Sequence, residues 1–174
     1  LLVVGAPESD SSDKIAGTVK RGAFCTYKIE GDTVAQLGKC KMGGSGNLGY
    51  SLDVSNYTTT QYQYPSGKLI IIPHAHLTVG NPEKERGGNY HQGQVNFYDF
   101  NETSEDWGTK NTATLQTDEY NARFGHSVAI DKDQVIIGAP NANDDKGLVF
   151  AHHSNGAHQQ TIYNFASEFV AASK

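Results

Sequence analysis

Short apolar stretches alternate with turn-forming residues along this 174-residue chain. The clearest series predicts three strands in succession, at Phe124–Ile130, Gln134–Ile137 and Gly147–Ala151. Asp131–Asp133 and the loop Asn141–Lys146 separate these strands. Asn and Asp favour turns because they tolerate left-handed backbone and bond their own main chain. Strand, turn, strand, loop and strand within about thirty residues indicate an antiparallel meander.

The same order of elements occurs twice more in the sequence. In the middle of the chain, the corresponding strands are Leu48–Val54, a run that ends at Gly80–Pro82, and Gly93–Tyr98. The N-terminal copy is truncated, with the second strand and its closing turn in Leu1–Pro7 and the third strand at Gly22–Tyr27. Repetition of this kind is typical of an array of small supersecondary units that stack on one another.

Each copy also has a candidate for a fourth, outer strand. These candidates lie at Asp32–Leu37, near Thr112–Leu115 and at Gln159–Tyr163. Four short antiparallel strands per copy, repeated at about 45 to 75 residues, favour the blades of a β-propeller. We therefore expect an all-β fold of about two and a half to three blades, which form part of a larger propeller.

The repeats divide the chain into a partial first blade at residues 1–47, a second at 48–120 and a third at 121–164. Residues 165–174 are a linker or the start of a further blade. The second copy is longer than the third between its first two strands. The excess, around residues 55–76, predicts an insertion in the form of a hairpin extension. Long loops on a repeat scaffold are where binding surfaces tend to be built.

The residues at the repeat boundaries resemble a known family. The Phe-Gly pair at 124–125, the Gly-Ala-Pro triplet at 138–140 and the glycine-led strand at 147–150 are similar to the FG-GAP repeat of integrin alpha-chain β-propellers. The second copy departs from this pattern, with Leu-Gly at 48–49 and Gly-Asn-Pro at 80–82. The resemblance implies an extracellular propeller of which this chain is one segment.

The resemblance also bears on metals and cysteines. Calcium-binding blades of the family carry an Asp-x-Asp-x-Asp-Gly type of loop between their first two strands. Asp131–Gln134 offers only two carboxylates around a lysine, whereas calcium needs about six to eight oxygen ligands. We therefore expect no metal and no cofactor. Cys25 and Cys40 lie where first blades of the family often carry a disulfide.

Charge and composition limit the possible partners and the cellular location of the protein. The net charge of −5 disfavours a nucleic-acid-binding surface, and no apolar run approaches the roughly 20 residues of a membrane span. A disulfide between Cys25 and Cys40 would close a loop of about 15 residues and stabilise the folded state by roughly 3 kcal/mol. The alternative is that both cysteines are free thiols in a cytosolic protein. The sequons at Asn56 and Asn101 predict N-glycosylation, and with the cysteines they favour an extracellular or cell-surface location.

Catalytic chemistry has little support in the sequence. His74 and His76 are two residues apart and therefore share one face of a strand, a workable pair of metal ligands. The chain has no HExxH or Cys-x-x-Cys spacing, so surface histidines are the simpler interpretation. Ser127 follows Phe-Gly-His without a G-x-S-x-G elbow. We expect no enzyme activity, no catalytic residue and no metal site.

We expect a binding role, in which loops on one face contact a protein or a glycan, or in which further blades or subunits complete the propeller. The predicted contact segments are Tyr57–Tyr64, Glu83–His91 and Asn141–Lys146. The residues predicted to bind are Tyr57, Tyr62, Tyr64, Tyr90, His91, Asn141 and Asn143, all placed in loop-like segments, whereas Trp107 is expected to pack. Two alternatives stay open: a stacking module of an extracellular filament or appendage, and an accessory propeller of a secreted hydrolase.

Overall fold

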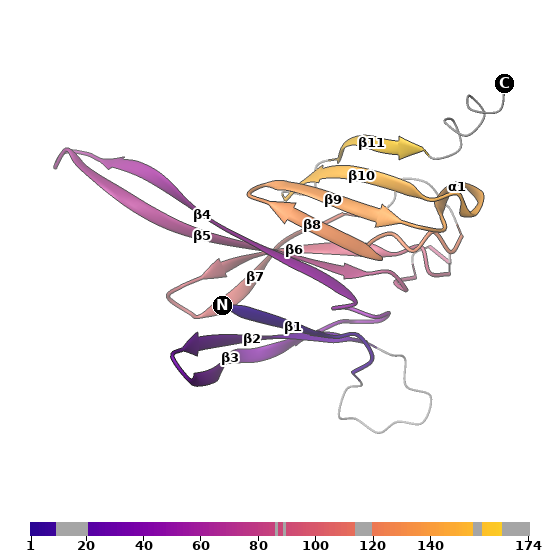
Figure 1. Ribbon diagram of the computed structural model, residues 1–174, viewed down its shortest axis with the longest axis horizontal. Coiled ribbons are helices and arrows are strands. Elements are labelled where there is room, and N and C mark those ends of the chain that lie inside the picture. The colour runs from indigo at the N-terminus through magenta and orange to yellow at the C-terminus, as the bar shows by residue number, and fades with distance from the viewer. Residues whose placement is uncertain (10–20, 86, 89, 114–119, 155–157, 165–174) are drawn as a thin grey trace.

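The computed structural model describes residues 1–9, 21–85, 87–88, 90–113, 120–154 and 158–164, which form three small antiparallel sheets (Figure 1). The first sheet consists of β1 (Leu2–Ala6), β2 (Ala23–Glu30) and β3 (Thr33–Met42). The second consists of β4 (Ser51–Gln63), β5 (Lys68–Asn81), β6 (Gln94–Asn101) and β7 (Asp106–Ala113). The third consists of β8 (Ser127–Asp131), β9 (Gln134–Ala139), β10 (Leu148–His153) and β11 (His158–Asn164). The all-β architecture predicted from the sequence is confirmed for these residues.

The three sheets share one internal register. In each sheet every strand pairs with the next strand along the chain, so each sheet is a meander. The glycine of the Gly-Ala-Pro or Gly-Asn-Pro triplet always faces the start of the following strand. The equivalent pairs are Gly5 with Phe24, Gly80 with Val95, and Gly138 with Val149. The repeat seen in the sequence is therefore also a repeat of strand pairing.

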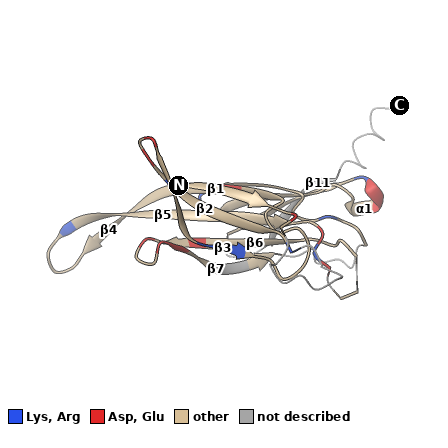
Figure 2. Cartoon of the chain, turned by 90° about the horizontal axis from the view of Figure 1, so that it is seen from below, with Lys and Arg blue, Asp and Glu red and all other residues tan. Residues whose placement is uncertain are grey.

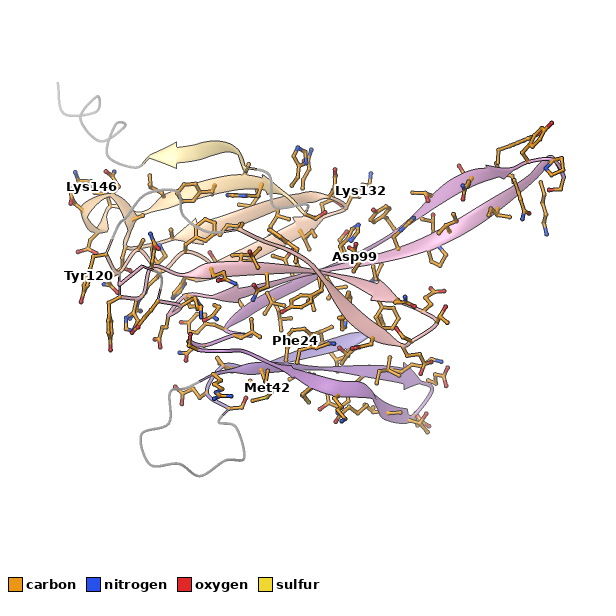
Figure 3. All side chains as sticks on the ribbon, turned by 180° about the vertical axis from the view of Figure 1, so that it is seen from behind. Phe24, Met42, Asp99, Tyr120, Lys132 and Lys146 are labelled. Carbon is orange, nitrogen blue, oxygen red and sulfur yellow. A yellow bond between two sulfur atoms is a disulfide. The ribbon has the colours of Figure 1, made fainter. Side chains whose placement is uncertain are left out.

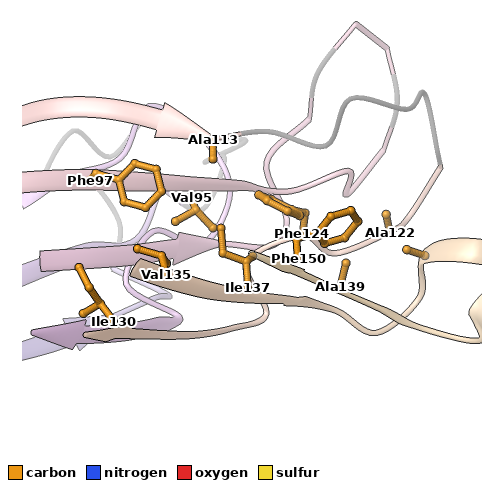
Figure 4. Packing of buried hydrophobic residues seen from close by; sticks show 11 residues of the cluster. Val95, Phe97, Ala113, Ala122, Phe124, Ile130, Val135, Ile137, Ala139 and Phe150 are labelled. Atoms are coloured by element: carbon orange, nitrogen blue, oxygen red, sulfur yellow. The ribbon is translucent and has the colours of Figure 1, made fainter. Parts of the chain in front are cut away.

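The second sheet lies between the first and the third, and two hydrophobic cores fill the spaces between them (Figure 1). Side chains of β5 alternate between the two sides, as a strand requires. Leu77 and Val79 face the first sheet and pack with Phe24, whose ring meets Tyr98 edge to face at 5.0 Å. The other core joins the second and third sheets (Figure 4), and its largest members are Phe97, Phe124, Ile137 and Phe150.

Glycines allow neighbouring sheets to approach each other closely. A Cβ on Gly80 would lie less than 3.0 Å from the carbonyl oxygen of Gly125 in the next repeat, and a Cβ on Gly5 would crowd Gly49 in the same way. Gly49 and Gly125 also have positive φ angles of 87° and 88°, which side chains disfavour. The two glycines of the repeat signature therefore meet across each junction between sheets.

Polar groups reinforce both junctions. Between the second and third sheets, Asp53 Oδ2 accepts a hydrogen bond from the backbone N–H of Ile130 at 2.8 Å. Between the first and second sheets, the buried indole of Trp107 donates to Thr26 Oγ1 at 2.7 Å. Trp107 therefore packs, as the sequence predicted. Cys25 and Cys40 form a disulfide between β2 and β3.

The first two strands of the second repeat form one long hairpin. Pairing between β4 and β5 runs without interruption from Ser51 with Gly80 to Gln63 with Lys68. The hairpin extension expected around residues 55–76 is thus present, and its outer part projects away from the three sheets (Figure 1). We call this outer part, Tyr57–His74, the arm.

Several element boundaries differ from the predictions. β7 begins at Asp106 instead of near Thr112, because the strand already pairs with the end of β6 there. β4 and β8 start at Ser51 and Ser127, three residues later than expected, because the positive-φ glycine of each repeat turns the chain first. The predicted loop Asn141–Lys146 contains the four-residue turn α1 (Ala142–Asp145), in which Asn143 and Asp144 are left-handed.

Candidate binding surface

The arm exposes an apolar strip on one of its faces. Directly paired residues share a face, so Tyr62 and Leu69 lie beside the pair Thr60 and Ile71. Tyr62, Leu69 and Ile71 are 67%, 59% and 69% exposed, and Tyr64 in the turn at the tip is 91% exposed. Isolated large apolar residues on a surface are ordinary, but several that share one ribbon face are typical of an interaction site.

The arm carries almost no charge. Lys68 is its only Lys, Arg, Asp or Glu, although the whole chain has 33 such residues (14 basic and 19 acidic). Figure 2 shows the arm uncoloured by charge except near its tip. A surface without ionised groups loses little hydration energy when it is covered, so the arm is suited to burial against another molecule.

The arm also has unpaired strand edges. β4 is the edge strand of the second sheet, and β5 pairs with β6 only from His76 to Asn81. Among the described strands, none pairs with the outer edge of the arm part of β4. Proteins usually protect such an edge with charged side chains or proline. Tyr57–Gln63 contains neither, so an extended segment of another chain can add to this edge.

A row of polar side chains fixes the base of the arm to the sheet. Tyr57, His76 and Asp99 come from three neighbouring strands, β4, β5 and β6. The Tyr57 hydroxyl lies 2.6 Å from His76 Nε2, and His76 Nδ1 contacts Asp99 Oδ1. Burial, together with the nearby charges of Asp133 and Asp99, raises the pKa of Tyr57. The two ring nitrogens of His76 therefore link the Tyr57 hydroxyl on one side to the Asp99 carboxylate on the other.

His74 belongs to the same base of the arm as Tyr57 and His76. Its ring stacks on Tyr57, with centroids 5.0 Å apart, and its Nε2 lies 2.8 Å from Thr59 Oγ1. Each of the two histidines thus already has hydrogen-bond partners within the sheet. Among the described residues, no three His, Cys, Asp or Glu side chains are grouped so that they could hold a metal ion.

The predicted binding residues fall into two separate groups. Tyr57, Tyr62 and Tyr64 belong to the arm, although Tyr57 and Tyr62 lie on β4 and not in a loop as predicted. Their strand position follows from the uninterrupted pairing with β5, which the Thr- and Gln-rich sequence did not reveal. Asn141 and Asn143 lie at α1, at the opposite end of the molecule (Figure 1). Tyr90 and His91 belong to the same end, because the Tyr90 ring contacts both His91 and Tyr120 beside Asn141.

Two members of this second group line a polar cavity, and the other two pack beside it through Tyr120. The Tyr90 ring packs on His91 and Tyr120, with centroids 4.6 Å and 6.4 Å away. Asn141 and Asn143 line a cavity of about 520 Å³ together with Tyr120, Asn121, Asp144 and Asp145. The segment Glu83–His91 is described except for positions 86 and 89. Because this cavity and the arm are far apart, one compact ligand cannot contact both (Figure 3).

Sequence reasoning missed the aliphatic side of the arm. It named the tyrosines of β4 but not Leu69 and Ile71 of β5, which are equally exposed. The continuous apolar run Leu69–Pro73 was a usable signal, since residues two apart on a strand share a face and such a run places apolar side chains on both faces. Asp99 was also missed, because only the strand register places it beside His76.

Comparison with known proteins identifies one of the repeats. The family model for the FG-GAP repeat matches residues 109–152, which span from β7 to β10. No curated protein matches the chain. The chain therefore contains an FG-GAP repeat, at the place where the resemblance is most complete in the sequence. The Cys25–Cys40 disulfide is typical of an oxidising compartment, and no helix among the described residues is long and apolar enough to cross a membrane.

Proposed function

We propose that this chain is a segment of an extracellular FG-GAP β-propeller that mediates adhesion by binding another macromolecule, and that it has no catalytic activity. The single observation that carries the proposal is the arm. It projects from the sheets, is nearly uncharged and exposes Tyr62, Leu69 and Ile71. An exposed two-stranded ribbon loses conformational entropy when it is ordered. A partner that covers the apolar face of the arm offsets this loss.

The chemistry of the arm favours a protein over a glycan as the ligand. Sugars are held by polar side chains placed around an aromatic ring, whereas the exposed face has two aliphatic side chains beside Tyr62. A protein can bury these side chains and also extend the sheet along the free edge of β4, through main-chain hydrogen bonds. The partner that fits best is a protein with an extended, uncharged segment.

A second candidate function is assembly with further sheets of the same kind. The outer face of the first sheet exposes Leu2 and Val4, and the outer face of the third exposes Ile136. These positions are equivalent to buried positions of the second sheet, where Val79 and Thr78 are covered by neighbours. Further blades or subunits that complete a propeller, or copies stacked in a filament, would cover these faces.

Adhesion can be tested with a panel of recombinant extracellular domains and a glycan array, probed with the purified chain. We expect one or more extracellular domains to bind. Ile71→Asp should weaken binding about 30-fold, the effect of losing one central contact residue. Gln61→Asp, on the opposite face of the arm, is the matched control and should change affinity less than about threefold.

Three results would overturn the proposal. One is a partner whose binding is unaffected by Ile71→Asp, which would move the site away from the arm. Another is binding to glycans only. The last is concentration-dependent self-association without any heterologous partner, measured by analytical ultracentrifugation, which would favour the assembly function instead.

A further inference from the structure

The arm and the sheet separate at a defined point. β5 and β6 are paired up to His76 and Asp99, and beyond this pair β5 continues into the arm while β6 continues to pair with β7. Figure 3 shows Asp99 close to this branch point. A gap therefore opens between the two strands, on the side where β5 has no neighbour.

Two adjoining cavities occupy this gap. The smaller has a volume of about 220 Å³ and the larger about 460 Å³, and both are bounded by Pro73, Phe100 and Glu102. Asn56, the asparagine of one sequon, lines the smaller cavity. Asn101, the asparagine of the other sequon, lines the larger one. Both predicted glycosylation sites thus border the same gap, although they are 45 residues apart in the sequence (101 minus 56).

We propose that an N-linked glycan on Asn56 packs its first N-acetylglucosamine into the smaller cavity and so supports the base of the arm. Pro73, Ala75 and Phe100 offer an apolar surface for the C–H face of the sugar ring. The Glu102 carboxylate accepts from the acetamido N–H or a ring hydroxyl. The inference rests on the extracellular location in the proposed function, but it does not depend on what the arm binds.

The chemistry requires a polyprenyl diphosphate-linked oligosaccharide as donor. The Asn56 side-chain nitrogen forms a bond to C1 of the first sugar, and the bond from C1 to the diphosphate oxygen breaks. The amide nitrogen loses one proton, and the polyprenyl diphosphate leaves with the electron pair. Asn56 is exposed, so the attached sugar remains compatible with the folded chain.

Asn101 provides an internal control. Its Oδ1 accepts hydrogen bonds from the backbone N–H groups of Thr103 and Ser104, at 2.9 Å and 3.1 Å, in the turn between β6 and β7. Its amide is therefore oriented by the turn, whereas Asn56 projects from β4 opposite Ala75, on the face of the smaller cavity. A sugar on Asn101 extends from an exposed turn and should add little to stability.

The test uses the whole chain secreted from eukaryotic cells. Peptide mass spectrometry first measures occupancy at Asn56 and Asn101. The folded protein is then treated with an endoglycosidase that leaves one N-acetylglucosamine, or with an amidase that removes the whole glycan and leaves Asp. We expect the single sugar to preserve the melting temperature, and complete removal to lower it by about 3 °C, which corresponds to a contact of about 1 kcal/mol.

Four variants make the result decisive. Asn101→Gln should still show the 3 °C loss, and Asn56→Gln should abolish the difference between the two treatments. Asn56→Asp reproduces the amidase product without any sugar, and Thr58→Ser preserves the sequon and should behave as the unaltered protein. An unoccupied Asn56 in secreted protein, or equal melting temperatures after both treatments, would overturn the inference while leaving the arm-binding experiment untouched.

Discussion

The hairpins β4–β5 and β8–β9 occupy equivalent places in successive repeats, yet they end very differently. They begin alike: Gly49 N–H donates to the Gly80 carbonyl, and Gly125 N–H donates to the Gly138 carbonyl, both at 3.1 Å. β8 then ends after 5 residues at a turn in which Lys132 is left-handed, whereas β4 continues for 13 residues. One repeat thus closes its hairpin at the edge of the sheet, and the other extends it into solvent.

The comparison shows that the repeat constrains only the part of a hairpin that neighbouring sheets cover. Within β5 itself, Leu77 and Val79 are fully buried between sheets, whereas Leu69 and Ile71 on the same face are exposed. Residues in the covered part must fit the packing, while residues in the arm are free to serve recognition. The following predictions test this division, beginning with the largest expected effect.

The largest effect is expected at the glycine of the second repeat. Gly80→Ala would place a methyl group less than 3.0 Å from the Gly125 carbonyl oxygen, which belongs to the backbone of the next repeat and cannot move aside. We expect a loss of at least about 4 kcal/mol in the free energy of unfolding, measured by urea denaturation. Gly138→Ala is the matched control, because its methyl group would meet only the rotatable Ser127 hydroxyl, and it should cost less than about 1 kcal/mol. Equal losses of stability in the two variants would show that the close approach at the junction between sheets does not make Gly80 more sensitive than Gly138.

A pair of leucines on β5 tests burial along one strand. Leu77→Ala removes a fully buried side chain from the core between the first and second sheets and should cost about 2–5 kcal/mol. Leu69→Ala lies on the same face of the same strand, in the arm, and should change stability by less than about 0.5 kcal/mol. Thermal unfolding of the two variants gives the comparison directly. Similar losses for both would show that the arm is packed in solution.

Alkaline pH should loosen the covered part of the second sheet. Burial raises the pKa of Tyr98 from 10.0 to about 12, so the folded state holds the phenolic proton more tightly than the unfolded state. The resulting stability, about 3 kcal/mol, is present below pH 10 and is lost as the pH rises from about 10 to 12. Urea unfolding measured across this range should show the loss, and Tyr98→Phe should reduce the slope. An unchanged slope in the variant would contradict the assignment to Tyr98.

The smallest effect on stability is expected from shortening the arm. Replacing Thr58–Pro73 with a two-residue turn such as Asn-Gly makes the second hairpin resemble β8–β9 and keeps the contact between Tyr57 and His76. The two sheet junctions lie outside the removed segment, so the free energy of unfolding should change by less than about 1 kcal/mol. Binding to a partner found with the intact chain should be lost. A collapse of stability would show that the arm is a structural element and not an appendage.

Much of the strand order was predictable because its signals are local. The β-branched run within Gln134–Ile137 and the turn residues around Lys132 are readable from neighbours in the sequence, and β8 and β9 follow them closely. The start of β7 was misplaced by several residues, since its pairing with β6 begins before any apolar alternation is visible. For the candidate binding surface, the tyrosines of the insertion were found, but the matching Leu69 and Ile71 were not.

The sequence by itself determined that this chain is a series of antiparallel β repeats, because a period of two and the turn-forming residues act over a few positions. It also determined which residues could form the disulfide, since only Cys25 and Cys40 were available. Only the tertiary structure decided that Gly80 touches a neighbouring sheet, whereas the contacts described for Gly138 are with Ser127 of its own sheet, and that Asp99 lies beside His76. Those contacts depend on where strands that are far apart in the sequence separate and stack. No short stretch of the sequence contains that information.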